Sequence, residues 1–215
     1  LNGPALYVGI DLGLTDFIVL SDGTKVANPK FLAKLEHKLA REQKVLAQRR
    51  GVAKAAHRNL SESNNYQKQR IKVAKLYEKI TNTRNDFLHK TSFNLIKNHD
   101  VIAVEDLNVK GMVKNRRLAK AISDSSWTKF ITMLTYKADW YGKQLVKIDR
   151  WYPSSKTCSG CGHVLGKGEL TLAMRQWQCP CCKVSNDRDI NASTNILNEG
   201  LRCLQTIKEP LVQGS

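Results

Sequence analysis

The stretch VIAVED, residues 101–106, decides how this chain folds. Four successive apolar side chains without polar alternation are typical of a strand buried on both faces, and such strands belong to sheets covered by helices. The run ends in two acids, Glu105 and Asp106. The sequence therefore predicts a buried strand of an α/β sheet that carries carboxylates at its carboxyl end.

Further strands are predicted on both sides of this run. Residues 5–10 and 15–20 are apolar, and the turn sequence SDGT at 21–24 indicates hairpin pairing, with a short third strand at 25–27. Residues 144–148 predict one more strand. Because helices separate these strands along the chain, the order implies a mixed sheet flanked by helices.

Helical spacing begins at Lys30. We expect one amphipathic helix there, interrupted by Gly51 and the polar stretch 59–65, and a second helix over 66–98. The two would form a basic helical hairpin. The apolar stripe of the first helix is Leu32, Leu35, Leu39 and Leu46. The same spacing predicts later helices over 127–142 and 189–198.

The charge balance predicts polyanionic partners. The chain has 35 Lys and Arg against 19 Asp and Glu, a formal net charge of +16, and the segment 30–84 alone has 15 basic and 4 acidic residues. An isolated charge run is usually a solvated helix face. With the motifs described below we favour nucleic acid, and we expect a mobile basic loop over 110–117 to contact its backbone. The candidate contacts in that loop are Lys110, Lys114, Arg116 and Arg117.

The overall composition excludes a membrane-spanning protein. A chain of 215 residues with 41% hydrophobic content can bury the core of one globular domain plus a small appendage. It has no apolar run of about 18 residues, and its N-terminal apolar run is too short for a secretion signal. We therefore expect a soluble cytoplasmic protein with no membrane partner.

Four cysteines have the spacing of a zinc site. Two Cys-x2-Cys pairs, separated by a gap of 17 residues, predict two knuckles that hold one structural zinc ion, and they are Cys158, Cys161, Cys179 and Cys182. Such a site has no open coordination position, so any chemistry must come from other residues. Cys181 and Cys203 are left over, and we expect them to be inert, partly buried thiols.

Three acids lie at the predicted ends of elements, at Asp11, Glu105 and Asp189. Alone, each has an ordinary interpretation as a turn residue, a solvated strand end or a helix cap. Together they could converge at the carboxyl ends of the strands and bind magnesium. Two such ions can hydrolyse a phosphodiester.

Four segments carry a resemblance to a known family. They are GIDLG at 9–13, VEDLNVKGM at 104–112, YPSSKTCSGCG at 152–162 and DRDINA at 187–192. From about Tyr7 to Gly200 the chain resembles the TnpB family, which insertion sequences of bacteria and archaea encode. Those proteins are RNA-guided DNA endonucleases with a RuvC-like, ribonuclease-H-fold domain and a zinc ribbon.

The resemblance implies roles for single residues. Asp11, Glu105 and Asp189 would be catalytic magnesium ligands, with Asp187 in support, and the four cysteines would bind zinc. The nuclease domain would cover 1–156 and 184–215, with a helical hairpin insertion at about 30–98, and the zinc ribbon would cover 157–183. A guide RNA derived from the end of the insertion sequence would be a partner along with DNA. Lys183 and Asn186 depart from the usual ribbon pattern, and we expect neither to touch a zinc ligand.

Other functions remain open at this stage. The chain begins at the nuclease without an initiator Met, so we expect a fragment or processed product whose N-terminal portion is supplied in cis in the full-length protein. A non-cleaving nucleic-acid-binding derivative, resembling a repressor, is the main alternative, and a DNA-strand transferase is a third. Lys156, Arg175 and Arg188 are candidates for holding phosphate. The four tryptophans could stack on bases, although core packing is the commoner role of Trp127, Trp140, Trp151 and Trp177.

Overall fold

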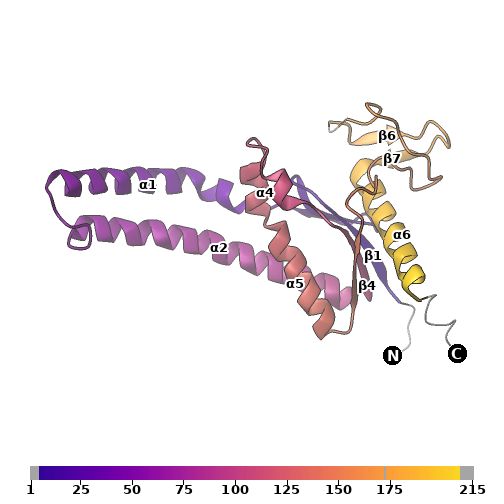
Figure 1. The fold of residues 1–215 in the computed structure, drawn as a ribbon, viewed down its shortest axis with the longest axis horizontal. Coiled ribbons are helices and arrows are strands. Elements are labelled where there is room, and N and C mark those ends of the chain that lie inside the picture. Colours follow the sequence, from indigo (N-terminus) through magenta and orange to yellow (C-terminus); the bar gives the residue numbers. More distant parts are fainter. Residues whose placement is uncertain (1–4, 172, 209–215) are drawn as a thin grey trace. The chain divides into compact units, whose positions relative to one another are not determined.

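The computed structural model describes residues 5–171 and 173–208. The chain divides into two compact units (Figure 1). One is the segment Lys30–Lys90, and the other combines Leu1–Pro29 with Thr91–Ser215. The larger unit contains the sheet and the candidate site residues, while the smaller one is helical.

A five-stranded mixed sheet in the order β3-β2-β1-β4-β5 forms the larger unit. β1 pairs parallel with β4 and antiparallel with β2, and β5 extends the parallel half. The VIAVE stretch forms β4 and is buried over its first four residues, as its sequence predicts. The strands of this sheet are β1 Tyr7–Leu12, β2 Asp16–Leu20, β3 Lys25–Ala27, β4 Val101–Glu105 and β5 Gln144–Ile148. The mixed α/β fold is therefore confirmed.

The first strand begins and ends later than its apolar pattern predicts. Asp11 pairs with Val19 of β2, so the hairpin ladder continues past the last apolar residue of the run. Asp11 is consequently part of β1, and not a turn residue that follows it.

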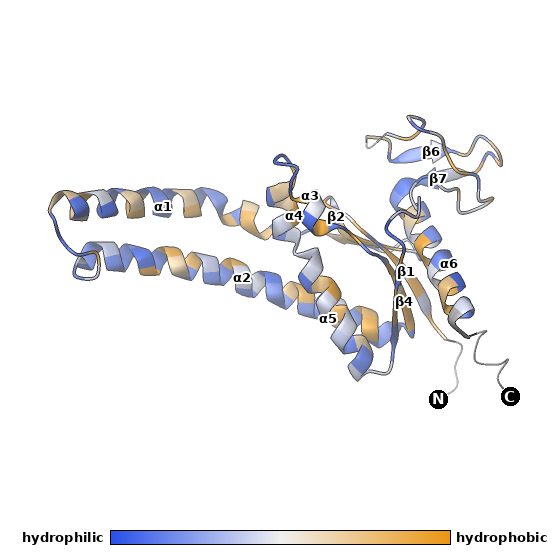
Figure 2. Ribbon diagram, in the orientation of Figure 1, coloured by the Kyte–Doolittle hydropathy of each residue, from blue (hydrophilic) through white to orange (hydrophobic). Residues whose placement is uncertain are grey.

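Helices α5 and α6 pack against the sheet. In the first turn of α5 (Trp127–Trp140), Phe130 packs edge-on against Phe17 of β2, with ring centroids 4.9 Å apart. α6 (Arg188–Lys208) packs along β1, β4 and β5, and Figure 2 shows apolar residues along the sheet it lies against. We predicted that this helix ends at residue 198, but it continues through Gly200. A Cβ at Gly200 would lie 2.5 Å from the Ala103 Cβ, so glycine permits close packing here and does not end the helix.

Gly9 is the second close contact between α6 and the sheet. A Cβ built on it would lie 2.0 Å from the Ser193 carbonyl oxygen and 2.7 Å from the Leu197 nitrogen. We expect Gly9→Ala to cost about 3 kcal/mol or more of unfolding free energy, because the helix backbone itself must move away from β1. Urea unfolding measures this, with Gly51→Ala as the matched control, since a Cβ there meets nothing within 4 Å. Equal midpoints for Gly9→Ala and the parent protein would contradict the prediction.

The smaller unit contains the predicted helical hairpin. α1 (Phe31–Ala55) is followed by α2 (Asn64–Asn98), whose last turns from Thr91 belong to the larger unit. Apolar residues from both helices pack together, and Gln69, with 1% of its surface exposed, donates to the Glu42 carbonyl at 2.9 Å. The buried members of this cluster are Phe31, Leu39, Val73, Leu76 and Ile80. Gly51 does not interrupt α1 as we predicted, because the hydrogen-bonded helix continues to Ala55.

The basic segment 110–117 is more ordered than the mobile loop we predicted. Its start lies in a short helix, α3 (Val109–Met112), because the Asn108 side chain accepts the Gly111 N–H at 3.0 Å and caps it. A second short helix, α4 (Ala119–Ser125), follows. All four basic side chains of the segment are exposed: Lys110, Lys114, Arg116 and Arg117.

The tryptophans divide equally between core and surface. Trp127 and Trp177 are buried, as core packing predicts, but Trp140 and Trp151 are 76% and 84% exposed. In the described part of the chain, none of the helices is long and apolar enough to cross a bilayer.

Candidate metal centres

The four predicted zinc ligands come together in a small lobe after β5. Their sulfur atoms all lie within 4.8 Å of one another, and the sulfurs of Cys158 and Cys182, like those of Cys161 and Cys179, are 3.6 Å apart. Two short antiparallel strands, β6 (Gln176–Gln178) and β7 (Ser185–Asp187), hold the second knuckle. Around the thiols pack Leu165, Leu170 and Trp177. Sequence reasoning missed both strands, which are only three residues long.

The surroundings of the Cys158 thiol favour its charged form, whereas the neighbouring thiols raise the pKa of Cys161 and Cys182 as long as no cation lies between them. Burial of the Cys158 thiol raises its pKa, but backbone N–H donors of Gly160 and Cys161 and the neighbouring thiols outweigh burial and lower the pKa to about 6. Such donors stabilise a thiolate, the form that binds metal. The donor set of four sulfurs therefore fits zinc.

Both departures from the ribbon pattern have structural consequences. Lys183 adopts a φ of 63°, as Gly162 does with 76° one residue after the first knuckle, which explains why glycine is usual at this position. Our expectation for Asn186 is wrong, because its Nδ2 donates to the Cys158 sulfur at 3.8 Å. Of the two remaining cysteines, Cys203 is partly buried as expected, whereas Cys181 is exposed.

Strand register places Asp11 and Glu105 next to each other. Gly9 pairs with Ala103 and Ile10 with Val104, so the parallel register, extended by one residue, brings Asp11 opposite Glu105. Both lie on the sheet face that α6 covers, since side chains alternate and Gly9 and Ala103 face that helix. Asp11 and Glu105 are each half-buried.

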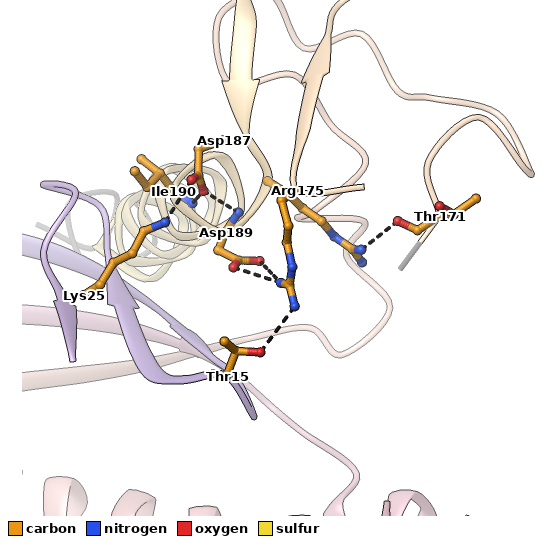
Figure 3. Close-up of polar contacts among 8 residues, drawn as sticks. Thr15, Lys25, Thr171, Arg175, Asp187, Asp189 and Ile190 are labelled. Carbon is orange, nitrogen blue, oxygen red and sulfur yellow. Dashed lines mark hydrogen bonds and ion pairs between the residues drawn. The ribbon is translucent and has the colours of Figure 1, made fainter. Parts of the chain in front are cut away.

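Asp189 lies over this face in the first turn of α6. Asp187 precedes it and caps the helix, because its Oδ1 accepts the backbone N–H groups of Asp189 at 3.0 Å and Ile190 at 3.1 Å. Lys25 of β3 holds the other oxygen of Asp187 at 2.8 Å (Figure 3). Burial alone would raise the pKa of Asp187, but the ion pair and the N–H donors hold it below its ordinary value.

The electrostatics join the three acids into one site. Burial, together with the negative charges of Glu105 and Asp189, raises the pKa of Asp11 to about 8. Burial also raises the pKa of Glu105, although the Ser154 hydroxyl donates to its Oε1 and partly opposes the shift. A cation between these half-buried carboxylates would offset the cost of keeping them charged, so the residues fit magnesium, an oxygen-binding ion.

Arg175 lies beside Asp189, as the side-chain view in Figure 3 shows. Its guanidinium donates to both oxygens of Asp189, at 3.1 and 3.3 Å, and to the Thr15 hydroxyl at 3.4 Å. Among the described residues the thiols form the one group whose ligand atoms all lie within 4.8 Å, and the three carboxylates are more widely spaced. Arg188 is also near, because its charge lowers the pKa of Asp11. Lys156 is half-buried in the segment that enters the zinc lobe.

Polar residues that our sequence analysis left without a role fix the zinc lobe to α6. Asn195 donates to the carbonyls of Ser154 and Thr157, at 2.8 and 2.6 Å, and Asn191 donates to Thr157 at 2.7 Å while accepting the Ser159 N–H at 2.8 Å. The segment from Ser154 to Ser159 thus connects the first knuckle, the helix that carries Asp189 and, through the Ser154 hydroxyl, Glu105. Asn191 lies inside the DRDINA motif, which was the available signal for it, whereas Asn195 lies outside both motifs.

Family profiles match most of this chain. Residues 2–116 match the family described as "Probable transposase", the OrfB protein of IS605. Residues 127–196 match the Cas12f1-like TNB domain.

Curated relatives are similar over nine-tenths of the chain. A Streptomyces pristinaespiralis protein, provisionally named an RNA-guided DNA endonuclease, is 45% identical over 194 residues, which cover 90% of this chain and 45% of the relative. An Escherichia coli K12 protein with the same provisional name is 32% identical over 211 residues, covering 91% of this chain and 49% of the relative. The chain therefore spans under half the length of these relatives.

Solved structures share the fold. Cas12f1 in complex with sgRNA and target DNA superposes with a TM-score of 0.57 at 19% identity, over 92% of this chain and 51% of the Cas12f1 chain. A CRISPR-Cas12f ternary complex gives 0.57 at 20% identity, over 91% and 39%. At this identity the likeness establishes a common fold.

Proposed function

Because the chain belongs to the TnpB-like family of IS605 OrfB proteins, we propose that it is the catalytic part of an RNA-guided DNA endonuclease with a ribonuclease-H-like, RuvC-type fold. In this proposal it hydrolyses DNA phosphodiester bonds in a bacterial or archaeal cytoplasm, guided by RNA from the end of an insertion sequence. The observation that supports cleavage most directly is that Asp11 and Glu105 are neighbours on the sheet face under α6, where the charges of Glu105 and Asp189 both raise the pKa of Asp11. A non-cleaving derivative would not need such a costly cluster of acids.

The proposed mechanism assigns the carboxylates to two magnesium ions. When bound, magnesium lowers the pKa of water and neutralises charge that develops on the phosphodiester. Asp11 and Glu105 would hold ions from the two neighbouring strands, and Asp189 would hold them from α6. The Ser154 hydroxyl would orient Glu105, and Asp187 would fix the first turn of α6 and so the position of Asp189.

Basic residues at the site would bind the substrate backbone. Arg175 already lies within hydrogen-bond distance of the Asp189 carboxylate, so a phosphate at the ions would come within reach of its guanidinium. Arg188 and Lys156 are the further candidates for phosphate contact. The exposed basic residues of 110–117 and the basic helical hairpin would contact nucleic acid farther along, in a salt-dependent manner.

Magnesium-dependent cleavage of single-stranded DNA tests the proposal. We expect the zinc-loaded protein to cleave a labelled strand with magnesium and to leave it intact without magnesium. The carboxylates bind the metal ions, and the attacking nucleophile is water that the ions activate. The control is salt-dependent binding of the same strand, measured without magnesium. Binding with no cleavage at any magnesium concentration would favour the non-cleaving derivative.

A further inference from the structure

Trp151 is an exposed aromatic residue in a turn that is otherwise held in place. Its indole is 84% exposed. The backbone N–H of Trp151 donates to Asp149 Oδ1 at 2.7 Å, and that of Tyr152 donates to the Asp149 carbonyl at 3.2 Å. The side chains on either side contact protein: Arg150 pairs with Asp106, and Tyr152 packs against the buried cluster of Ala103, Ile148 and Ile196. The turn is thus fixed while its indole faces solvent.

The same turn is connected to the carboxylate site at two points. On one side Arg150 pairs with Asp106, which follows Glu105 directly. On the other side Ser154 donates to Glu105 itself, and the three residue-to-residue steps from Trp151 to Ser154 can span at most about 10 Å. Adjacent nucleotides of one strand are about 3.4 Å apart along a helix axis. If a strand is bound at Glu105, the indole is therefore only a few nucleotides away from the bound phosphodiester.

The chemistry of this surface favours a nucleobase over an apolar protein partner. Basic residues lie close to Trp151 in the sequence, the exposed Lys147 four positions before it and the half-buried Lys156 five positions after it, and such side chains suit a phosphate backbone. The other exposed tryptophan, Trp140, differs because Tyr136 already packs edge-on against it at 4.7 Å. An exposed indole on a fixed turn, with basic residues close to it in the sequence, suits the binding of unpaired bases by stacking.

We propose that Trp151 is a base-stacking residue, which takes an unpaired nucleobase of the DNA strand that enters the carboxylate site. The inference deepens the proposed function and rests on it for the identity of the strand. Its role is to fix where the strand lies relative to Glu105, independent of base sequence, since every base has a face that can stack.

The test measures binding of a short single-stranded DNA to the zinc-loaded protein without magnesium, so that the strand stays intact. We expect Trp151→Ala to weaken binding about ten-fold, Trp151→Phe to restore most of it, and Trp140→Ala to leave it unchanged. Zinc content and the thermal midpoint, measured for every variant, verify the fold.

An abasic strand of the same length separates stacking from a structural role. It keeps the phosphates and lacks the bases, so the parent protein and Trp151→Ala should bind it equally. Equal binding of the ordinary strand by both proteins, or a similar loss on the abasic strand, would overturn the proposal. Both results are obtained without cleavage. Failure of the proposed nuclease activity would appear separately, as an intact strand after magnesium is added.

Discussion

Asp11→Asn is expected to abolish DNA cleavage and, at the same time, to stabilise the metal-free protein. The neutral amide of asparagine binds a magnesium ion more weakly than the carboxylate does, so the cleavage rate should fall on the order of a thousand-fold. The free energy of unfolding of the metal-free protein should rise, because the substitution removes one of several acids that repel one another. The pKa of Asp11 in the folded protein is about 8, above the ordinary value of 3.8, so the folded state binds its proton more tightly than the unfolded state does.

The sign of the pH dependence follows from that difference. Between about pH 4 and about pH 8 the folded state carries more protons on Asp11 than the unfolded state, so the stability of the parent protein falls as the pH rises. Asparagine does not titrate. The variant should match the parent near pH 4 and exceed it by about 2 kcal/mol near pH 8, a figure reduced from the full shift because the carboxyl is only half-buried.

Urea unfolding across this pH range, with zinc bound and without magnesium, measures the effect. Asp139→Asn is a matched control, because Asp139 is an exposed acid on α5 outside the site. Added magnesium should raise the stability of the parent protein and leave that of Asp11→Asn unchanged, since the ion stabilises only the state that binds it. Parallel pH profiles for parent and variant would disprove the electrostatic account of the site.

The sheet was predictable from sequence where strands carry a plain hydrophobic pattern. β4 reads as a buried strand because helices cover both of its faces, and β3 and β5 have the predicted bounds. The helix ends were harder. Gly51 lies within α1 and Gly200 within α6, although glycine often ends a helix. A glycine inside a helix can also simply be tolerated, or it can permit close packing against a neighbouring element. Only the neighbouring element decides between these roles.

For the candidate site, the ligand types were predictable but their supports were not. Spacing alone identified the four thiols that the structure brings within 4.8 Å of one another, since two knuckles are local features. Ser154 and Asn195 act through partners 49 and 41 positions away along the chain, so no local pattern indicates them. The pairing of Arg175 with Asp189 is likewise a tertiary contact between the zinc lobe and α6. The sequence predicted Arg175 as a neighbour of the site without predicting its partner.

Cys179→Ser is expected to unfold the zinc lobe and to abolish cleavage while the main sheet stays folded. The lobe has two strands of three residues and a small apolar cluster, which is too little to fold without metal. The Cys179 sulfur is fully buried among the other thiols, so a serine there removes a ligand that no solvent group can replace. Zinc content should fall, and the rate of cleavage should fall by about a hundred-fold or more, since second-shell supports alone are worth that much.

The loss of cleavage would come from Arg175 and the Ser154 segment, and not from the sheet. Arg175 directly precedes β6 of the lobe, and its guanidinium reaches Asp189. Asp11 and Glu105 lie on β1 and β4, which pair with each other and do not depend on the lobe. Far-ultraviolet circular dichroism should therefore keep its helical signal while hydrogen exchange rises over residues 157–187 alone. The matched control is Cys181→Ser, because Cys181 is exposed and outside the four-thiol group. If Cys179→Ser kept its zinc and its cleavage rate, the lobe could not be what holds Arg175 at the carboxylates, and the site would need another account of its geometry.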